Sequence, residues 1–214
     1  MDLPFIETVA IEAQMPPGVL GPGPATLDVR CFLVTTASGI VLVDAGLPGT
    51  SGAIDATLGR LGAGWSHVTD IVLTHSHFDH TGGLAEAVGR AAQATVRAGA
   101  LDVAAIAPDG GIGVKPLAEG DRVGDLEVLD TPGHTPGHIS LLHMSGSVAI
   151  VGDLVGSVDG ALSFGPPQFT ADPERARASL DRVARMGATR LLFSHGAEVQ
   201  DPNGAALALL GATL

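Results

Sequence analysis

Short apolar segments alternate along this chain with alanine-rich segments that carry polar residues on one side. The apolar segments are rich in Val, Ile and Leu and are bounded by Gly, Pro or Asp, which is typical of strands. They predict strands at Leu27–Thr35, Ile40–Asp44, Asp70–Thr74, Ala94–Arg97, Leu126–Thr131, Ile139–Met144, Val148–Gly152 and Leu191–Ser194. The remaining pattern predicts helices at Thr50–Leu61, Thr81–Ala92, Leu101–Ala107, Pro173–Arg185 and Gly204–Leu210. This alternation favours an α/β fold in which helices cover two sheets, arranged as two similar halves.

The segment Pro173–Arg185 carries clear helix signals. Asp172 can serve as its N-cap, Pro173 as its first helical residue and Gly187 as its stop. Its charged residues are expected to face outward. The apolar residues are spaced for one buried stripe, which is made of Ala176, Leu180 and Val183.

Two loops interrupt the pattern. Residues Met15–Ala25 contain four prolines and three glycines, which excludes regular structure there. Residues Ser163–Ala171 carry Gly165-Pro166-Pro167 between Phe164 and Phe169. Loops of this kind either line binding sites or form rigid surface crossovers, and the sequence leaves both interpretations open.

Composition indicates one globular domain over residues 1–214. Of the 214 residues, 45% are hydrophobic and 16% are charged, which excludes a disordered or acidic-tail protein. The formal net charge is −12, so neither nucleic acid nor an anionic membrane surface is expected as a main partner. The single cysteine, Cys31, excludes an internal disulfide.

The amino-terminal residues Met1–Phe5 show no basic leader followed by an apolar block. No apolar run approaches the ~20 residues that a membrane span needs. We therefore expect a soluble, cytoplasmic protein.

Potential metal ligands are concentrated in residues 75–80, which read His75-Ser76-His77-Phe78-Asp79-His80. This segment directly follows an apolar strand, and His75 and His77 project from the same side of an extended chain. Asp79 and His80 lie where the chain turns into the next helix. Imidazole nitrogens and carboxylate oxygens together are ligands that zinc prefers and that iron or manganese also accept.

Further candidates follow later strands of the predicted sheets. His134 lies in a Gly- and Pro-constrained turn after one strand, Asp153 directly follows another, and His195 follows the last. Active groups of α/β proteins gather beyond the carboxyl ends of strands, where each of these residues lies. Together with residues 75–80 they supply five histidines and two aspartates, enough for two adjacent metal ions that share one carboxylate.

These residues carry a resemblance to a known family. From Val41-Leu42-Val43-Asp44-Ala45-Gly46, through the HxHxDH segment, to Ser194-His195-Gly196, the chain resembles the metallo-β-lactamase-fold hydrolase superfamily, in its glyoxalase II and lactonase-like branch. The resemblance implies a four-layer αββα sandwich with two metal ions between the sheets. It implies the following ligands: His75, His77 and His134 for the first ion, Asp79, His80 and His195 for the second, and Asp153 for both.

Two further residues are expected to support these ligands. Asp44 matches a family position whose hydrogen bonds orient the ligands, although a turn cap at a strand end would also explain it. His138 lies close to the site in sequence, and we expect it to support His134 from behind.

The expected reaction follows from two neighbouring divalent cations, which lower the pKa of a bridging water towards ~7. The resulting hydroxide attacks a carbonyl that the first ion polarises, and Asp79 orients the hydroxide. We therefore expect hydrolysis of an ester-like bond in a small molecule, a thioester or a lactone. The ions are expected to be zinc, with iron or manganese as alternatives.

Departures from individual branches narrow the choice. Only 19 residues follow His195, too few for the glutathione-binding domain of glyoxalase II relatives, and the chain lacks the tyrosine that lactonase relatives use. The negative charge and the 42-residue spacing from Asp153 to His195 argue against nucleic-acid processing. The alternative is an oxygenase that resembles persulfide dioxygenases, in which one iron is held by His75, His134 and Asp153.

The substrate itself is less clearly indicated. Phe78, Phe164 and Phe169 suggest an apolar pocket wall, and few basic residues lie near the motifs, which argues against a strongly anionic substrate. The metal ions would themselves attract anions. Superfamily members are often dimers, so a homodimer is a further expectation.

Overall fold

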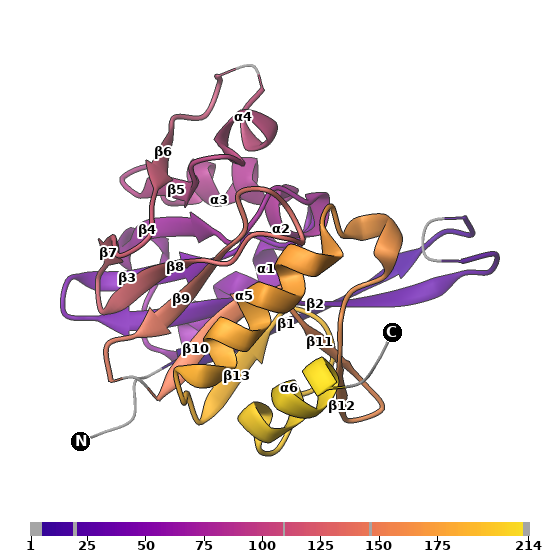
Figure 1. Ribbon diagram of the computed structural model, residues 1–214. Coiled ribbons are helices and arrows are strands. Elements are labelled where there is room, and N and C mark those ends of the chain that lie inside the picture. Colours follow the sequence, from indigo (N-terminus) through magenta and orange to yellow (C-terminus); the bar gives the residue numbers. More distant parts are fainter. Residues whose placement is uncertain (1–5, 19–20, 109, 146, 212–214) are drawn as a thin grey trace.

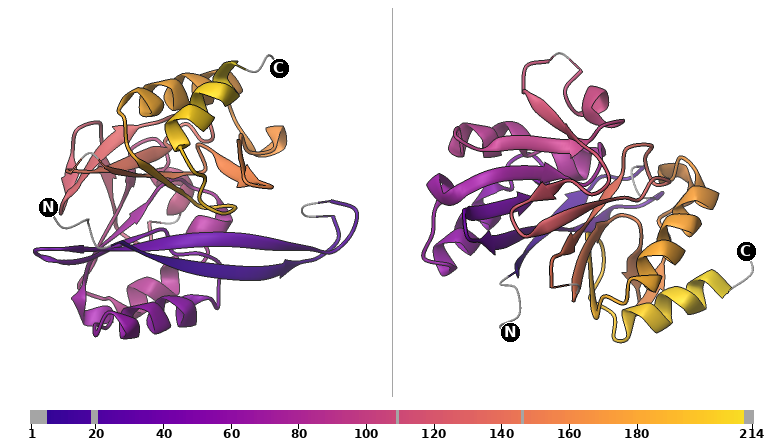
Figure 2. Two further views of the ribbon diagram at one scale, coloured as in Figure 1. Left: turned by 90° about the horizontal axis from the view of Figure 1, so that it is seen from below. Right: turned by 60° about the vertical axis from the view of Figure 1, so that its left-hand side comes forward.

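Two sheets stack face to face between outer helices in the computed structural model, which describes residues 6–18, 21–108, 110–145 and 147–211 (Figures 1 and 2). The first sheet has the order β1 (Ile6–Met15), β2 (Ala25–Thr36), β3 (Gly39–Val43), β4 (Val68–Leu73), β5 (Thr95–Gly99), β6 (Val114–Leu117). The second has the order β13 (Arg190–Phe193), β10 (Val148–Gly152), β9 (Ile139–His143), β8 (Leu126–Asp130), β7 (Arg122–Val123). A separate hairpin pairs β11 (Gly156–Val158) with β12 (Ala161–Ser163).

The helices form the two outer layers. They are α1 (Ser51–Arg60), α2 (Phe78–Thr81), α3 (Leu84–Arg90), α4 (Val103–Ile106), α5 (Pro173–Arg185) and α6 (Pro202–Gly211). Helices α1 and α3 lie against the first sheet, whereas α5 and α6 cover the second (Figure 2). The expected α/β four-layer αββα sandwich is confirmed.

Burial on both faces of the sheets explains their continuous apolar strands. In β3, Leu42 packs in the core between the first sheet and its helices, and its neighbours Val41 and Val43 pack between the two sheets. A third cluster joins the second sheet to α5 and α6 and includes Leu180 and Ala206. Strands buried on two sides lose the alternation of half-exposed strands, because both sets of side chains face a core.

The first hairpin extends further than the sequence predicts. Met15 and Ala25, expected to lie in an irregular loop, are paired strand ends of β1 and β2, so that prediction is wrong at both ends. Of the residues between them, 19–20 lie outside the described residues. The resulting two-stranded ribbon projects beyond the rest of the molecule (Figures 1 and 2).

The helix predicted at Thr81–Ala92 is wrong as a single element. Helix α2 ends at Thr81 and α3 begins at Leu84, with Gly82 and Gly83 between them. A Cβ atom on Gly83 would lie only 2.2 Å from the carbonyl oxygen of Ala45. The backbone after the HxHxDH segment must therefore pass very close to the loop after β3, and this contact holds α2 against the site.

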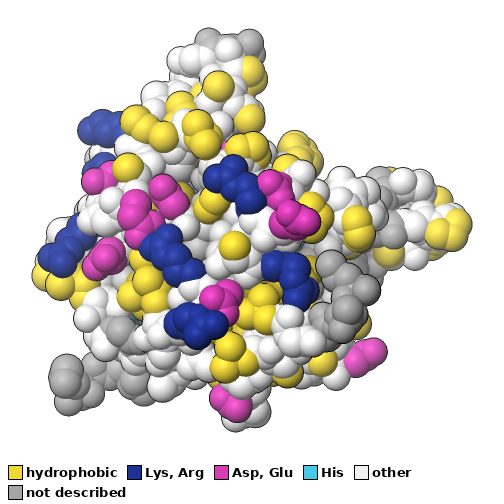
Figure 3. All heavy atoms as spheres, viewed as in Figure 1, with side chains coloured by type: hydrophobic (Ala, Val, Ile, Leu, Met, Phe, Trp, Pro, Cys, Tyr) yellow, Lys and Arg dark blue, Asp and Glu magenta, His cyan; other side chains and the backbone are white. Residues whose placement is uncertain are grey.

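Helix α5 agrees with its prediction at both ends. The Asp172 carboxylate accepts a hydrogen bond from the Arg175 N–H at 3.0 Å, as an N-cap does. The outer face of α5 carries basic and acidic side chains intermixed (Figure 3). One ion pair of this helix joins Arg185 to Asp181 at 2.7 Å. Within the described part of the chain, no helix combines the length and apolar character that a membrane crossing requires.

Candidate metal centre

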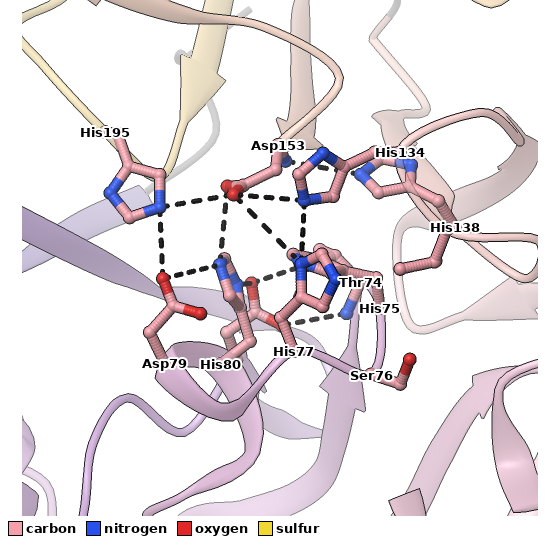
Figure 4. Close-up of polar contacts among 12 residues, drawn as sticks. Thr74, His75, Ser76, His77, Asp79, His80, His134, His138, Asp153 and His195 are labelled. Atoms are coloured by element: carbon pink, nitrogen blue, oxygen red, sulfur yellow. Dashed lines mark hydrogen bonds and ion pairs between the residues drawn. The ribbon is translucent and has the colours of Figure 1, made fainter. Parts of the chain in front are cut away.

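All seven predicted ligands converge between the two sheets (Figure 4). Each follows the end of a strand or lies in α2, directly after β4: His75 and His77 follow β4, Asp79 and His80 lie in α2, His134 follows β8, Asp153 follows β10 and His195 follows β13. Segments more than a hundred residues apart therefore meet at one edge of the sandwich. Their meeting place is the one expected from strand ends in α/β proteins.

The first group consists of three imidazoles. His77 Nδ1 lies 3.1 Å from His75 Nε2 and 2.9 Å from His134 Nε2. Tetrahedral zinc with bond lengths of about 2.0–2.1 Å places its nitrogen ligands about 3.3 Å apart. The three nitrogens are thus spaced much as ligands of one cation would be.

The second group consists of Asp79, His80, Asp153 and His195. His195 Nε2 lies 3.2 Å from Asp79 Oδ2 and 3.2 Å from Asp153 Oδ2, and His80 Nε2 lies 3.3 Å from Asp153 Oδ1. The Asp153 carboxylate also reaches the first group, because its Oδ2 is 3.4 Å from His134 Nε2. Asp153 therefore lies between the two groups (Figure 4).

Hydrogen bonds behind the ligands decide which ring nitrogen faces inward. His80 Nδ1 donates to Asp44 Oδ2 at 2.8 Å, so Nε2 is the nitrogen left to face Asp153. The Thr74 hydroxyl donates to the same Asp44 carboxylate at 2.9 Å, so it can accept a hydrogen bond from His75 Nδ1 at 3.1 Å. The contacts of Asp44, which is completely buried, are those expected of a residue that orients ligands.

His195 and His138 are held by other partners. His195 Nδ1 donates to the backbone carbonyl of Asp28 at 2.5 Å, which leaves Nε2 facing the cluster. His138 Nε2 accepts from the Asp153 backbone N–H at 3.2 Å, and its Nδ1 contacts the Thr131 hydroxyl at 2.9 Å. The expectation that His138 supports His134 stays a prediction: the two rings lie edge to face with their centroids 6.0 Å apart, while the hydrogen bonds of His138 hold Thr131 and the backbone of Asp153.

The cluster has the character of a cation site. His80 Nε2 and Asp153 Oδ1 are buried and 3.3 Å apart, yet they are not aligned for a hydrogen bond with each other or with any other described group. Buried polar atoms are usually satisfied. His80 and Asp153 belong, with Asp79 and His195, to a group whose potential ligand atoms all lie within 4.8 Å of one another. A divalent cation would fit such a group by its preference for nitrogen and oxygen donors.

Electrostatic coupling within the cluster shifts the pKa of its members in opposite directions. Burial favours neutral imidazoles and lowers the pKa of His134 to about 4. For His195, burial acts the same way, but the Asp153 and Asp79 carboxylates outweigh it and raise the pKa to about 10. The pKa of His80 is raised well above its usual value because Asp153 and Asp44 outweigh its burial. Without metal, protons on His80 and His195 therefore balance the carboxylates.

These shifts predict a stability maximum near neutral pH for the metal-free protein. The raised pKa of His195 and of His80 means that the folded chain holds protons above about pH 7 that the unfolded chain, with histidine near 6.5, has lost. Stability then falls as pH rises, by up to about 1.4 kcal/mol per pH unit for each such proton. Below about pH 6.5 stability instead falls as pH falls. His134 and His138, with pKa values of about 4 and 3, stay neutral in the folded chain, whereas the same side chains of the unfolded chain take up protons.

The measurement is urea unfolding of chelator-treated protein between pH 5.5 and 8.5. Metal-loaded protein serves as the control, because a bound cation displaces the protons on His80 and His195 and should flatten the alkaline side. If the stability of the metal-free protein stayed constant or rose from pH 7.5 to 8.5, His80 and His195 would not carry the protons assigned to them.

Asp102 is a residue of the site that sequence reasoning missed. Its buried carboxylate accepts hydrogen bonds from the Ser76 N–H at 2.9 Å, the Gly137 N–H at 2.7 Å and the Thr135 hydroxyl at 2.6 Å. It thereby joins the loop between His75 and His77 to the turn after His134. In the sequence Asp102 resembles an ordinary polar residue at the start of a short helix, and no spacing relates it to either loop.

Replacing Asp102 with alanine is expected to weaken both the fold and the first group of ligands. Three buried donors would lose their acceptor, at about 1–3 kcal/mol each where no other partner is found. Zinc affinity is expected to fall about 10- to 100-fold, as for other residues that orient ligands. Urea unfolding and competition with a chromophoric chelator measure the two effects. Asp102→Asn, which keeps one oxygen, should lie between the wild type and Asp102→Ala, and unchanged zinc affinity in both variants would disprove the positioning role.

A cavity of about 470 Å³ opens onto the cluster. Its floor includes His77, Asp79, His134, Asp153 and His195, and its wall includes Phe78, Phe164 and Phe169. The expected apolar pocket wall is therefore confirmed. Of the two interpretations of the loop Ser163–Ala171, a lining of the binding site is the one that the structure supports.

Comparisons with known proteins agree with this geometry. The model of the metallo-beta-lactamase superfamily matches residues 25–195. The chain is 30% identical over 209 residues to protein YobT of Bacillus subtilis (strain 168), covering 84% of this chain and 88% of that protein. It is 33% identical over 190 residues to a hydroxyacylglutathione hydrolase of Rhodospirillum rubrum, covering 84% of this chain and 69% of that enzyme.

Among solved structures, TTHA1623 in a di-iron-bound form is similar with a TM-score of 0.68 and 28% identity, over 91% of this chain and 96% of that one. The family match runs from the start of β2 to His195 and so contains every residue of the cluster. With the layered fold, the converging side chains and these matches taken together, the chain belongs to the metallo-β-lactamase superfamily.

Proposed function

We propose that this protein is a metal-dependent hydrolase that holds two divalent cations and cleaves a thioester or lactone. The observation that carries the proposal is the inward convergence of the seven side chains, with Asp153 between both groups. His75, His77 and His134 would hold one cation, Asp79, His80 and His195 the other, and Asp153 both. Bound there, the cations supply a Lewis acid for a carbonyl oxygen and lower the pKa of a water molecule towards about 7.

Asp79 is the residue that we assign to proton handling. Its side chain lines the cavity, and its Oδ2 lies 3.2 Å from His195 Nε2. Burial raises the pKa of Asp79, but the hydrogen bond from His195 and the charges of His80 and His195 together outweigh burial and lower it, so the carboxylate is ionised at neutral pH. An ionised carboxylate at this place can orient a water molecule and accept its proton.

The overall reaction balances with water as the only co-reactant. An oxygen from water bonds to the acyl carbon, and the C–S or C–O bond breaks with its electron pair on the departing atom. One proton of the water ends on the thiol or hydroxyl that leaves, and the other is released by the carboxylic acid product. Asp79 carries the first of these protons between the two positions.

The relatives support a thioester as one substrate class. Several are hydroxyacylglutathione hydrolases, a name that denotes cleavage of an acyl group from glutathione. The chain spans 69% of the Rhodospirillum rubrum enzyme and 49% of the one from Hahella chejuensis, so their substrate is not carried over whole. Zinc is our proposal for the metal, and iron is its main competitor because a similar structure is in a di-iron-bound form.

Metal analysis coupled to a substrate panel tests the proposal. We expect two metal ions per chain and cleavage of thioesters or lactones that does not need oxygen. Chelation should remove this activity, and adding back one kind of metal should restore it. Phosphodiesters and a β-lactam serve as controls in the panel. One iron per chain with oxygen consumption on glutathione persulfide would overturn the proposal in favour of an oxygenase, which the four converging ligands of the second group argue against.

Replacing Asp79 with alanine is expected to lower kcat by about 100- to 10,000-fold, the range for loss of a general base. Metal content is measured on the same samples, and at least the first group should keep its ion because Asp79 is not part of it. Asp159→Ala, which removes an exposed aspartate from the turn between β11 and β12, is the matched control. Unchanged turnover in Asp79→Ala would refute its role.

A further inference from the structure

The wall of the cavity above the cluster is made almost entirely of hydrocarbon. It is assembled from distant parts of the chain: Met15 and Leu27 come from the β1–β2 ribbon, Leu47 from the loop after β3, Phe78 from α2, Val155 and Val158 from the β11 region, and Phe164, Pro166 and Phe169 from the following loop. Five separate segments thus present apolar side chains to one space. Its volume lies in the usual range for small-molecule sites.

The charged groups of this cavity belong to the metal cluster. Among the described residues that line it, the ionisable ones are His77, Asp79, His134, Asp153 and His195, and none is Lys or Arg. Arg177 lies behind the wall, where its guanidinium is 5.6 Å from the centre of the Phe164 ring. The same guanidinium donates to the Leu210 carbonyl at 2.5 Å, so it supports the wall and does not line the cavity.

Apolar side chains also surround the mouth of the cavity. Phe78 is 65% exposed, Val158 64% and Phe169 38%. Large apolar side chains that remain in water around a pocket are typical of ligand-binding sites, since a ligand can remove their surface from water. A carboxylate or phosphate at the same place would find no cationic side chain of the described wall to pair with.

We propose that the substrate is an uncharged thioester or lactone that carries a hydrocarbon chain, which the wall binds while the scissile carbonyl lies over the cluster. This inference rests on the proposed hydrolase function and narrows it. It implies that the acyl chain supplies the binding energy. A thioester with an anionic leaving group such as glutathione is therefore expected to be a poor substrate.

The first experiment measures kcat/KM of the metal-loaded enzyme with N-acetylcysteamine thioesters from acetyl to decanoyl. We expect kcat/KM to rise by up to about fourfold per added methylene until the cavity is filled. The glutathione thioester of the same acyl group should react at least about tenfold more slowly, because its carboxylates gain no partner. A flat chain-length series, or a preference for the glutathione conjugate, would overturn the inference and leave the hydrolase function intact.

A binding measurement separates this inference from the proposed chemistry. Calorimetry with the uncleavable thioethers S-butyl- and S-octyl-N-acetylcysteamine should give the octyl compound the higher affinity, by at least about tenfold. If no thioester or lactone is cleaved but this difference is found, the hydrolase proposal fails and the apolar binding site stands. Equal affinities would overturn the site.

A variant that introduces a positive charge at the mouth provides the last test. Val158→Arg places a cation at the exposed mouth, and it should lower kcat/KM for the octanoyl thioester and raise it for the glutathione conjugate, each by about tenfold. Met144→Arg is the matched control, because Met144 is 53% exposed and does not line the cavity. Metal content should stay unchanged in both variants, and turnover of the acetyl thioester should stay unchanged in Met144→Arg. The same selectivity in Val158→Arg and Met144→Arg would count against binding at this wall.

Discussion

In the proposed two-cation hydrolase, Asp153→Asn is expected to remove most of the hydrolytic activity and to empty at least one of the two metal positions. The Asp153 carboxylate is the group shared by both ligand sets, with contacts of 3.4 Å to His134, 3.2 Å to His195 and 3.3 Å to His80. Asparagine has nearly the same shape, but it replaces one oxygen by an amide NH₂ that cannot bind a cation and it removes the negative charge. We expect kcat/KM to fall at least about 1,000-fold and metal affinity at least about 100-fold.

Metal content per chain and thioester hydrolysis are measured on the same preparations. Asp159→Asn makes the identical chemical change at an exposed turn and should leave both quantities unchanged. A second readout comes from the metal-free protein, in which Asp153 helps to raise the pKa of His195 to about 10. The alkaline loss of stability should therefore become smaller in Asp153→Asn. A variant that keeps two ions and turnover within tenfold of the wild type would contradict the shared position.

The meeting place of the seven candidate ligands could be predicted from the sequence, because each directly follows an apolar strand or lies in the short helix α2 after β4. A run such as residues 148–151 indicates a strand buried on both faces, and a polar residue directly after it must lie at the carboxyl edge of a sheet. One can therefore infer that strand ends from both sheets meet at one edge without knowing which strands pair. The HxHxDH segment is informative for the same reason, since it combines close spacing with a place after β4.

The supporting residues could not be found this way, because their roles depend on contacts distant in sequence. Asp28 holds His195 through its backbone carbonyl, a group that every residue possesses. Asp102 and His138 act on loops that only the folded chain brings next to them. Local spacing carries no trace of such partners.

The missed strands have a different cause. In β1, only Val9 and Ile11 are fully buried, so the alternating pattern is short and weak. Strand β6 contains Pro116, which normally argues against a strand, but β6 lies at the edge of its sheet, where a missing N–H is tolerated. Residue propensities did not predict these two strands, because their place in the sheet decides whether such a segment forms a strand.

Asp44→Ala is expected to be the most destabilising single substitution considered for this site. The buried carboxylate accepts hydrogen bonds from the Thr74 N–H at 2.8 Å, the Thr74 hydroxyl at 2.9 Å and His80 Nδ1 at 2.8 Å. Alanine would leave these donors without their acceptor, at about 1–3 kcal/mol each. A loss of at least about 4 kcal/mol is expected, which is a large part of the 5–15 kcal/mol that holds a typical domain folded.

Backbone strain must be separated from the lost hydrogen bonds, because Asp44 has a φ of 61° and alanine disfavours that region. Asp159, with a φ of 50°, is exposed and so supplies the matched control: Asp159→Ala should cost only about 1 kcal/mol, the strain alone. Asparagine tolerates the same φ and keeps one oxygen, so Asp44→Asn should be less destabilising than Asp44→Ala. It should still weaken zinc binding about 10- to 100-fold, because His80 loses the charged acceptor that fixes its tautomer. Urea unfolding and chelator competition give the two quantities. Equal destabilisation by Asp44→Ala and Asp159→Ala would mean that the buried hydrogen bonds contribute nothing, and Asp44 would then be only a residue that tolerates the turn after β3.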